Sequence, residues 1–292
     1  ALHRKRVGAR AMTVGLGGLI LAGIGRVLSA NGVQIAGDPM SYGMAAVILS
    51  SVVASAQITA DRLARLERSR LLGKFVPSAL ARRILTGEPF PRQERRCLTI
   101  FFSDLRGFTT ITDKTQPETL ASALDTYLTA MAEIAEEFGA TVDKFIGDAV
   151  MVFFGAPDSI DDGEGAVRCV AMAVKMQNHM SELNPKLREI GLMDEFRMRI
   201  GINTGLAAVG EFGSQQRSDY TAIGAQVNLA QRLESNCPVG HIMISKETWK
   251  LVNGRFKCLP HDPILPKGLD KPVEVWTIDP LDAVPDQLPD GR

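Results

Sequence analysis

The chain has 292 residues, a length that suggests two domains or one domain with an appendage. Its 33 basic and 33 acidic side chains balance, so no overall charge favours nucleic acid or another polyanion as a partner. The four cysteines are far apart and form no CxxC pair, which argues against a disulfide framework or a zinc site and favours reduced thiols. The chain begins at Ala1 rather than Met, so we expect a piece of a longer protein.

Two uncharged stretches lie near the N-terminus. Residues 11–25 are rich in glycine, leucine and isoleucine, and residues 40–60 have about the length of a membrane span. Arginine and lysine flank the outer ends of both stretches, which by the positive-inside rule places those ends in the cytoplasm. We expect residues 1–60 to be a membrane-spanning helical hairpin, the end of a larger membrane region in a cell inner membrane. The alternatives are a Gly/Ala-rich hairpin in a soluble core, or a signal peptide for the first stretch.

The next segment is predicted to be a linker. Residues 61–75 place leucines among charges, which predicts a helix that leaves the membrane and pairs with a copy of itself, although the repeat is too short to define a coiled coil. Residues 86–96 carry two prolines, a glycine and mixed charges, which is typical of an irregular connection. We assign residues 61–96 to the linker, 97–280 to the second domain and 281–292 to a C-terminal tail.

The second domain alternates strands and helices. Its first six elements follow the order β-α-β-β-α-β, which predicts an α/β (α+β) domain with a ferredoxin-like sheet. In chain order we expect a strand over 97–104, a helix over 117–139, two strands in 141–155 joined at Gly147–Asp148, a helix over 163–190, a strand pair at 196–205 and 207–213, a polar loop over 219–224, a helix over 225–234, and strands over 241–245 and 272–278.

Two aspartates occupy strand ends in this pattern. Asp104 closes the apolar strand "LTIFFSD", where a carboxylate has lost most of its water and needs a partner. Asp148 lies in the predicted hairpin. Carboxylates at the ends of adjacent strands can hold two magnesium ions whose shells substrate phosphates complete. A buried hydrogen bond for Asp104 and an ordinary Gly-Asp turn for Asp148 are the alternatives.

Two further groups are candidates for phosphate and ribose contacts. The glycine-containing turn "LRGFTT" includes Phe108 and Thr109, and its backbone N–H groups can cradle a phosphate. Asn228 and Arg232 are four residues apart on one predicted helix and so share a face. An amide and a guanidinium suit a ribose oxygen and a phosphate whose charge grows in a transition state. A solvated surface pair is the alternative.

Four motifs occur in order and at matching spacing: "TIFFSDLRGFT", "VDKFIGDAVMVFFG", "RIGINTG" and "DYTAIGAQVNLAQRLE". Over residues 97–279 the chain resembles the catalytic domain of class III nucleotidyl cyclases. The resemblance implies conversion of a nucleoside triphosphate to a 3′,5′-cyclic nucleotide and pyrophosphate. It also implies attack of the ribose 3′-oxygen on the α-phosphorus, assisted by two Mg²⁺ or Mn²⁺ ions in each active site.

The resemblance also implies how the base is chosen. Lys144 matches the lysine that contacts adenine in adenylate cyclases, where guanylate cyclases have a glutamate. Thr221 falls at the second base-contacting position, where many members have aspartate, guanylate cyclases have cysteine and one subgroup has threonine or serine. Thr221 therefore agrees with adenine but departs from the commonest pattern, which leaves base selectivity mainly on Lys144.

The remaining roles carry over in the same way. Asp104 and Asp148 match the metal-binding aspartates, Asn228 the asparagine that orients the ribose, and Arg232 the arginine on the α-phosphate. Lys267 resembles the lysine that reaches the terminal phosphates, although the alignment is looser there.

In this family two catalytic domains pair head to tail, and each active site lies between them. The two aspartates of one copy then complete the site that holds the base-, ribose- and phosphate-binding residues of the other. Because one chain carries both sets, the resemblance implies a homodimer formed through the catalytic domain and the linker helix.

We therefore expect a membrane-anchored adenylate cyclase that acts on ATP in the cytoplasm. A guanylate cyclase is the nearest alternative and is opposed by Lys144. The other is a catalytically silent cyclase-like module that binds nucleotide or dimerises, although such domains usually lack one of the residues present here. A diguanylate cyclase shares the sheet order, but no "GGDEF"-like turn stands at the hairpin.

Overall fold

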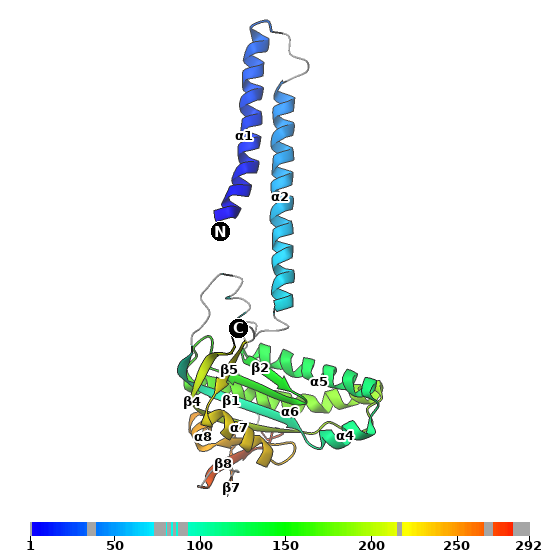
Figure 1. The fold of residues 1–292 in the computed structure, drawn as a ribbon, viewed down its shortest axis with the longest axis vertical. Coiled ribbons are helices and arrows are strands. Elements are labelled where there is room, and N and C mark those ends of the chain that lie inside the picture. The colour runs from blue at the N-terminus through cyan, green and yellow to red at the C-terminus, as the bar shows by residue number, and fades with distance from the viewer. Residues whose placement is uncertain are drawn as a thin grey trace. The chain divides into compact units, whose positions relative to one another are not determined.

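The structure is a computed structural model and describes residues 2–33, 39–72, 80, 83, 86, 93–214, 218–265 and 271–282. The chain divides into two compact units, Ala1–Phe75 and Val76–Arg292. The first unit is a pair of long helices, and the second is a β-sheet with helices packed on it (Figure 1).

The helical unit is a hairpin of α1 (Leu2–Ala30) and α2 (Pro39–Leu72) (Figure 1). The two helices approach closely at small residues. A Cβ atom added at Gly43 would lie 2.5 Å from the Cβ of Ala22, and one at Gly18 would lie 2.8 Å from the Cβ of Ala46. Glycine is therefore required at these two positions because a side chain would separate the helices.

The predicted spans are only partly supported. Among the described residues, Ser41–Ala64 is the one helical segment long and apolar enough to cross a membrane by length and composition, and Leu16–Ala30 is apolar but shorter. Large apolar side chains of both helices are exposed, among them Leu21 and Leu49. The predicted linker helix is continuous with the second span, because α2 runs unbroken to Leu72. The end of that prediction, residues 73–75, lies outside the described residues.

The second unit is built on an eight-stranded sheet with the order β2-β3-β1-β4-β6-β8-β7, and β5 pairs with β4. The strands are β1 (Glu94–Leu105), β2 (Thr141–Ile146), β3 (Ala149–Phe154), β4 (Met198–Gly213), β5 (Ser218–Ile223), β6 (Ile242–Ser245), β7 (Leu259–Ile264) and β8 (Val273–Ile278). The helices are α4 (Phe108–Lys114), α5 (Pro117–Glu137), α6 (Asp162–Ile190), α7 (Ala225–Asn236) and α8 (Lys246–Val252).

The predicted ferredoxin-like order is confirmed by β1, α5, β2, β3, α6 and β4. β1 lies between β3 and β4 and is antiparallel to both. The predicted α5, α6 and α7 and the β2–β3 hairpin are present with ends close to those expected. Four short elements, α4, β5, α8 and β7, were not predicted.

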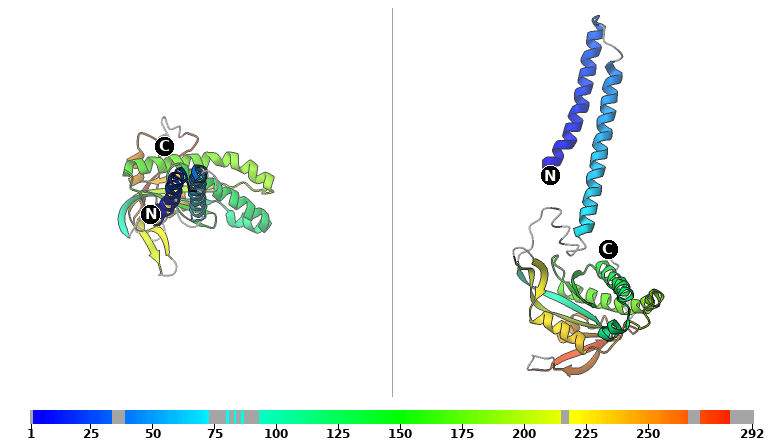
Figure 2. Two further views of the ribbon diagram at one scale, coloured as in Figure 1. Left: turned by 90° about the horizontal axis from the view of Figure 1, so that it is seen from above. Right: turned by 45° about the vertical axis from the view of Figure 1, so that its right-hand side comes forward.

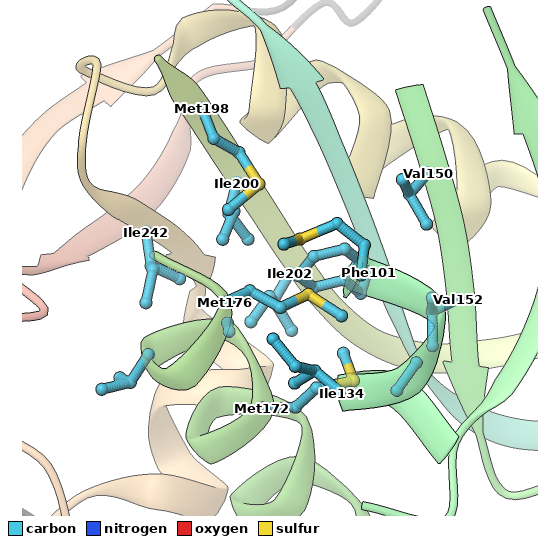
Figure 3. Packing of buried hydrophobic residues seen from close by; sticks show 14 of the residues in the cluster. Phe101, Ile134, Val150, Val152, Met172, Met176, Met198, Ile200, Ile202 and Ile242 are labelled. Atoms are coloured by element: carbon cyan, nitrogen blue, oxygen red, sulfur yellow. The ribbon is translucent and has the colours of Figure 1, made fainter. Parts of the chain in front are cut away.

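The middle of the central strand β1, residues 98–102, is mostly apolar because both of its faces are covered there. Phe101 and Leu105 point into the core beneath α5 and α6, whereas Ile100 and Phe102 point to the opposite face, where Ala230 of α7 packs. Figure 2 shows α5 and α6 together on one face of the sheet, and Figure 3 shows methionine side chains of α6 gathered against Phe101.

Two sequence predictions around β4 are wrong. Residues 196–205 and 207–213 are not a strand pair, because Met198–Gly213 is one continuous strand. The glycines in it are not breaks but make room for α7: a Cβ at Gly201 would lie 2.1 Å from the backbone nitrogen of Glu234, and one at Gly205 would lie 2.9 Å from the side chain of Gln226.

The predicted polar loop over 219–224 is also wrong, because Ser218–Ile223 forms β5 and Thr221 pairs with Gly210 of β4. The sheet also begins before the predicted boundary at Cys97. Glu94, the first residue of β1, already pairs with Val209 of β4. The polar residues of β5 and the charged first residues of β1 become strand only by pairing with β4, so local composition did not reveal either feature.

Candidate active site

Asp104 and Asp148 lie side by side at one end of the sheet. The β1–β3 ladder places Ser103 opposite Val150, which brings the end of β1 next to the hairpin that carries Asp148. The Oδ2 atom of Asp148 accepts a hydrogen bond of 3.0 Å from the backbone N–H of Leu105, the residue after Asp104. The structure therefore brings together the two carboxylates that the sequence singled out.

The electrostatics of this pair fit a cation. Burial raises the pKa of Asp148 to about 6, the Leu105 N–H lowers it, and the neighbouring carboxyl of Asp104 raises it again. Two half-buried carboxylates that disfavour each other's charge supply the hard oxygen ligands that Mg²⁺ and Mn²⁺ prefer. In the described parts of the chain, no group of three or more His, Cys, Asp or Glu side chains is placed to hold a metal ion.

Arg199, which the sequence analysis did not single out, links Asp104 to Glu234. Its Nη2 atom donates to Asp104 Oδ2 at 2.9 Å, and its Nε atom forms an ion pair of 2.9 Å with Glu234 Oε1. Burial raises the pKa of Glu234 to about 7, although the Arg199 charge opposes this. Arg199 could have been found only from the register of the β1–β4 pair, because this register places Arg199 directly opposite Asp104.

Lys144 on β2 and Thr221 on β5 meet at Asp143, a residue that the sequence analysis also missed. The Thr221 hydroxyl donates to Asp143 Oδ2 at 2.5 Å, and the Lys144 ammonium lies 3.5 Å from Asp143 Oδ1. The Asp143 side chain is 1% exposed. Burial raises its pKa, while the Thr221 hydrogen bond and the Lys144 charge lower it. The two predicted base-contacting residues therefore share one buried carboxylate.

Asn228 and Arg232 lie one turn apart on α7, as predicted. Asn228 is exposed and Arg232 is partly exposed, and neither side chain forms a hydrogen bond or ion pair with another described residue. The buried face of the same helix, which includes Val227 and Ala230, anchors α7 to the sheet. An amide and a guanidinium are thus held on a fixed helix without a competing partner among the described residues.

The turn after Asp104 leads into the short helix α4. Gly107 adopts the left-handed conformation (φ 75°) that starts α4, and Phe108 and Thr109 form its first turn. The Phe108 ring packs edge-on against Phe196 at 6.0 Å between centroids. Lys267, the remaining predicted site residue, lies outside the described residues.

A pocket of about 760 Å³ lies at the other end of β3, between the α5–β2 connection and the start of α6. Its lining includes Gly139, Pro157 and Arg168 but none of the predicted site residues. This pocket is therefore separate from the predicted site residues that the structure describes.

Comparisons with known proteins agree with the motifs. A profile of the "Adenylate and Guanylate cyclase catalytic domain" family matches residues 90–280. Adenylate cyclase 1 of Rhizobium meliloti (strain 1021) is 34% identical over 162 residues, which cover 55% of this chain and 24% of that protein. This chain thus spans about a quarter of the length of that relative.

Two solved structures are similar to the second unit. The adenylyl cyclase CyaB from P. aeruginosa is 41% identical with a TM-score of 0.64, and the match covers 68% of this chain and 99% of that one. The guanylyl cyclase Cya2 is 40% identical with a TM-score of 0.61, over 64% of this chain and 94% of that one.

Proposed function

Because the chain belongs to the adenylate and guanylate cyclase catalytic domain family, we propose that it is an adenylate cyclase, which converts ATP to 3′,5′-cyclic AMP and pyrophosphate. The observation that carries the proposal is the pairing of Asp104 with Asp148 at the end of β1, because this chemistry needs an anionic site for cations. Lys144 supports the choice of adenine.

Asp104 and Asp148 would hold two Mg²⁺ or Mn²⁺ ions in each active site. When bound, such ions increase the acidity of the ribose 3′-hydroxyl and stabilise negative charge on the phosphates. The two carboxylates position these charges at the end of a rigid strand and its neighbouring hairpin. Burial and, to a smaller extent, the neighbouring Asp104 carboxyl raise the pKa of Asp148, and a bound cation would offset both effects, which supports this role.

Lys144 and Thr221 would contact the base. An ammonium group can only donate hydrogen bonds, so Lys144 suits the acceptor nitrogen N1 of adenine and not the N1–H of guanine. The position of Thr221, tied to the same carboxylate as Lys144, supports their joint action on one ligand edge.

Asn228, Arg232 and Lys267 would hold the rest of the nucleotide. Asn228 would orient the ribose, Arg232 would bind the α-phosphate and Lys267 the terminal phosphates, with backbone N–H groups of Phe108 and Thr109 as further phosphate donors. A bond forms between the ribose 3′-oxygen and the α-phosphorus while the bond to the bridging oxygen of pyrophosphate breaks, and the hydroxyl proton passes to water. Arg232 then compensates charge that grows on the α-phosphate.

The active sites would be shared between two copies of the chain through the catalytic domain and the linker helix. Exposed apolar side chains on the sheet support a partner there, because monomeric proteins rarely leave such groups in water together. Phe145, Ile146, Leu206 and Ile223 are 43%, 53%, 59% and 48% exposed. In a head-to-tail pair the aspartates of one copy serve the nucleotide held by Lys144, Thr221 and α7 of the other.

We also propose that residues 1–60 anchor the enzyme in the inner membrane as a helical hairpin and that a linker joins them to the cytoplasmic catalytic domain. This domain begins with β1 at Glu94, instead of at the predicted residue 97, and extends to residue 280, with 281–292 as a tail. The length and apolar composition of Ser41–Ala64 support the anchor. Basic residues on the outer flanks of the hairpin support the cytoplasmic orientation.

Product analysis tests the proposed activity. The purified chain is incubated separately with ATP and GTP, each with Mg²⁺ and then with Mn²⁺, and the products are identified by mass spectrometry. We expect cyclic AMP and pyrophosphate in equal amounts, and no product when the metal is chelated. Cyclic GMP as the main product would instead support the guanylate cyclase alternative. That alternative is worth testing because the chain is 40% identical to the guanylyl cyclase Cya2. No product with either nucleotide would favour a silent module.

A further inference from the structure

Asp143 is a buried carboxylate in contact with both residues proposed to read the base. An ionised carboxylate can only accept hydrogen bonds, so in the 2.5 Å contact the Thr221 hydroxyl must be the donor. The backbone N–H of Ala222 donates to Asp143 as well. Lys144 lies on the other oxygen, at 3.5 Å.

The Thr221 hydroxyl has one proton, and the contact with Asp143 uses it. Thr221 is 8% exposed and the Asp143 side chain 1% exposed, so water does not compete for that proton. The hydroxyl oxygen is therefore left as an acceptor towards any ligand, whereas the Lys144 ammonium is a donor. Together the two side chains present one acceptor and one donor.

This polarity matches one purine and not the other. Adenine offers an amino donor at N6 beside an acceptor at N1, whereas guanine offers an acceptor at O6 beside a donor at N1. When Lys144 faces N1, as proposed above, and Thr221 faces the group at position 6, adenine forms two hydrogen bonds and guanine faces two mismatches. A site built to pair buried polar groups discriminates strongly against a ligand that leaves them unpaired.

We propose that Asp143 is a specificity-determining positioning residue: by accepting the Thr221 proton and facing Lys144, it sets the hydrogen-bond polarity that selects adenine over guanine. This inference rests on the proposed adenylate cyclase function and on the assignment of Lys144 and Thr221 to the base. Asp143 itself does not touch the nucleotide.

The substitution Asp143→Asn reverses the polarity with almost no change in shape. Its side chain offers one oxygen and one NH₂ group, and the Lys144 ammonium favours the oxygen on its side. The NH₂ group then faces Thr221 and donates to it, which frees the hydroxyl proton for the ligand. A hydroxyl donor suits O6 of guanine and opposes the amino group of adenine.

Equilibrium binding of non-cyclisable nucleotides is the direct test. We would titrate the α,β-methylene analogues of ATP and GTP into the full chain and into Asp143→Asn, with melting temperature as the control for folding. We expect the wild-type chain to prefer the ATP analogue and the variant to lower the ATP-to-GTP affinity ratio by about tenfold or more. Asp143→Glu, which keeps an acceptor, should retain more of the preference.

A matched pair at Thr221 keeps the test sharp if Asp143→Asn does not fold. Thr221→Val removes the hydroxyl that Asp143 polarises and should lower the ratio, whereas Thr221→Ser keeps the hydroxyl and should preserve it. An unchanged ratio in a folded Asp143→Asn or in Thr221→Val would overturn the inference, as would a wild-type chain with no preference for the ATP analogue.

Failure of the proposed function is distinguishable, because binding does not depend on turnover. A wild-type chain that prefers the ATP analogue but makes no cyclic AMP would contradict the enzyme assignment and leave the role of Asp143 standing. If the chain makes cyclic AMP while Asp143→Asn keeps the full preference for the ATP analogue, the enzyme assignment stands and the role of Asp143 is contradicted.

Discussion

Arg199 stands directly opposite Asp104 across the β1–β4 ladder, and its guanidinium donates to the Asp104 carboxylate at 2.9 Å. The same guanidinium pairs with Glu234, whose side chain is 7% exposed. Removal of one member of a buried ion pair leaves the other charge without compensation. Arg199 therefore holds a proposed metal ligand in place and also stabilises the contact between β4 and α7.

Arg199→Ala should lower the free energy of unfolding by about 3 kcal/mol, because Glu234 would remain buried without its partner. Urea denaturation measures this. The matched control is the double variant Arg199→Leu with Glu234→Leu, which removes both charges and should recover much of the loss. If Arg199→Ala denatures at the wild-type urea concentration, the ion pair contributes no stability.

The second prediction concerns the proposed metal ligands. Asp104→Ala and Asp148→Ala should each abolish turnover while the fold persists, because each removes a carboxylate whose main role is to bind cations. Circular dichroism controls for folding. Near-normal activity of Asp148→Ala would show the metal assignment to be wrong.

The raised pKa of Asp148 adds a pH dependence to this prediction. A carboxyl group with a pKa of about 6 is ionised above that pH and protonated below it. Protons should therefore compete with the metal, so the affinity for Mn²⁺ should fall as the pH decreases from 8 through about 6. Titration followed by electron paramagnetic resonance measures the affinity, and one that stays constant over this range would contradict the prediction.

The third prediction concerns the base. Lys144→Glu with Thr221→Cys should weaken the use of ATP and admit GTP, since a carboxylate accepts hydrogen bonds from guanine where an ammonium can only donate. Steady-state kinetics with both nucleotides measure this change. Unchanged ATP kinetics in the single variant Lys144→Ala would remove the lysine from the base site.

The fourth prediction concerns the membrane segment. Deletion of residues 1–60 should give a soluble catalytic fragment that loses activity on dilution. In the proposed dimer one copy lacks a complete site, so without the anchor the assembly follows mass action. The measurement is specific activity between nanomolar and micromolar protein, with sedimentation to follow the dimer. A specific activity that stays constant while the fragment sediments as a monomer would count against shared sites.

The fold was predictable wherever a local pattern decides it. The apolar run that ends at Asp104, the helical spacing of α5 and the Gly147–Asp148 hairpin all follow from neighbouring residues, and the structure has them. β5 was missed because its polar sequence becomes a strand only through pairing with β4. β4 was split at Gly205, which is not a break but the point where Gln226 of α7, a helix that lies later in the chain, approaches the strand closely.

The residues of the candidate site also differ in whether the sequence alone could reveal them. Asp104, Asp148 and Lys144 stand in recognisable motifs, so the sequence suggested them directly. Arg199 and Asp143 become visible only when β4 lies against β1 and β5 lies near β2, because their importance comes from the side chains they contact. Position in a motif predicts a ligand-facing residue, whereas a residue that orients it has to be found in the folded chain.

Mixing two inactive variants tests the shared-site homodimer most directly. Asp148→Ala lacks a metal ligand in both sites of its dimer, and Asn228→Ala lacks the ribose-orienting amide in both. In a mixed dimer one site combines the intact Asp148 of one chain with the intact Asn228 of the other, while the opposite site carries both defects.

Random exchange makes about half of the dimers mixed, each with one good site of two, so about a quarter of wild-type activity should return. Co-purification of differently tagged chains establishes that exchange has occurred. Recovery of about a quarter of the activity is the result that the account predicts. A mixture that exchanges freely yet stays as inactive as its components would contradict it, because a site built within one chain keeps a defect in every copy.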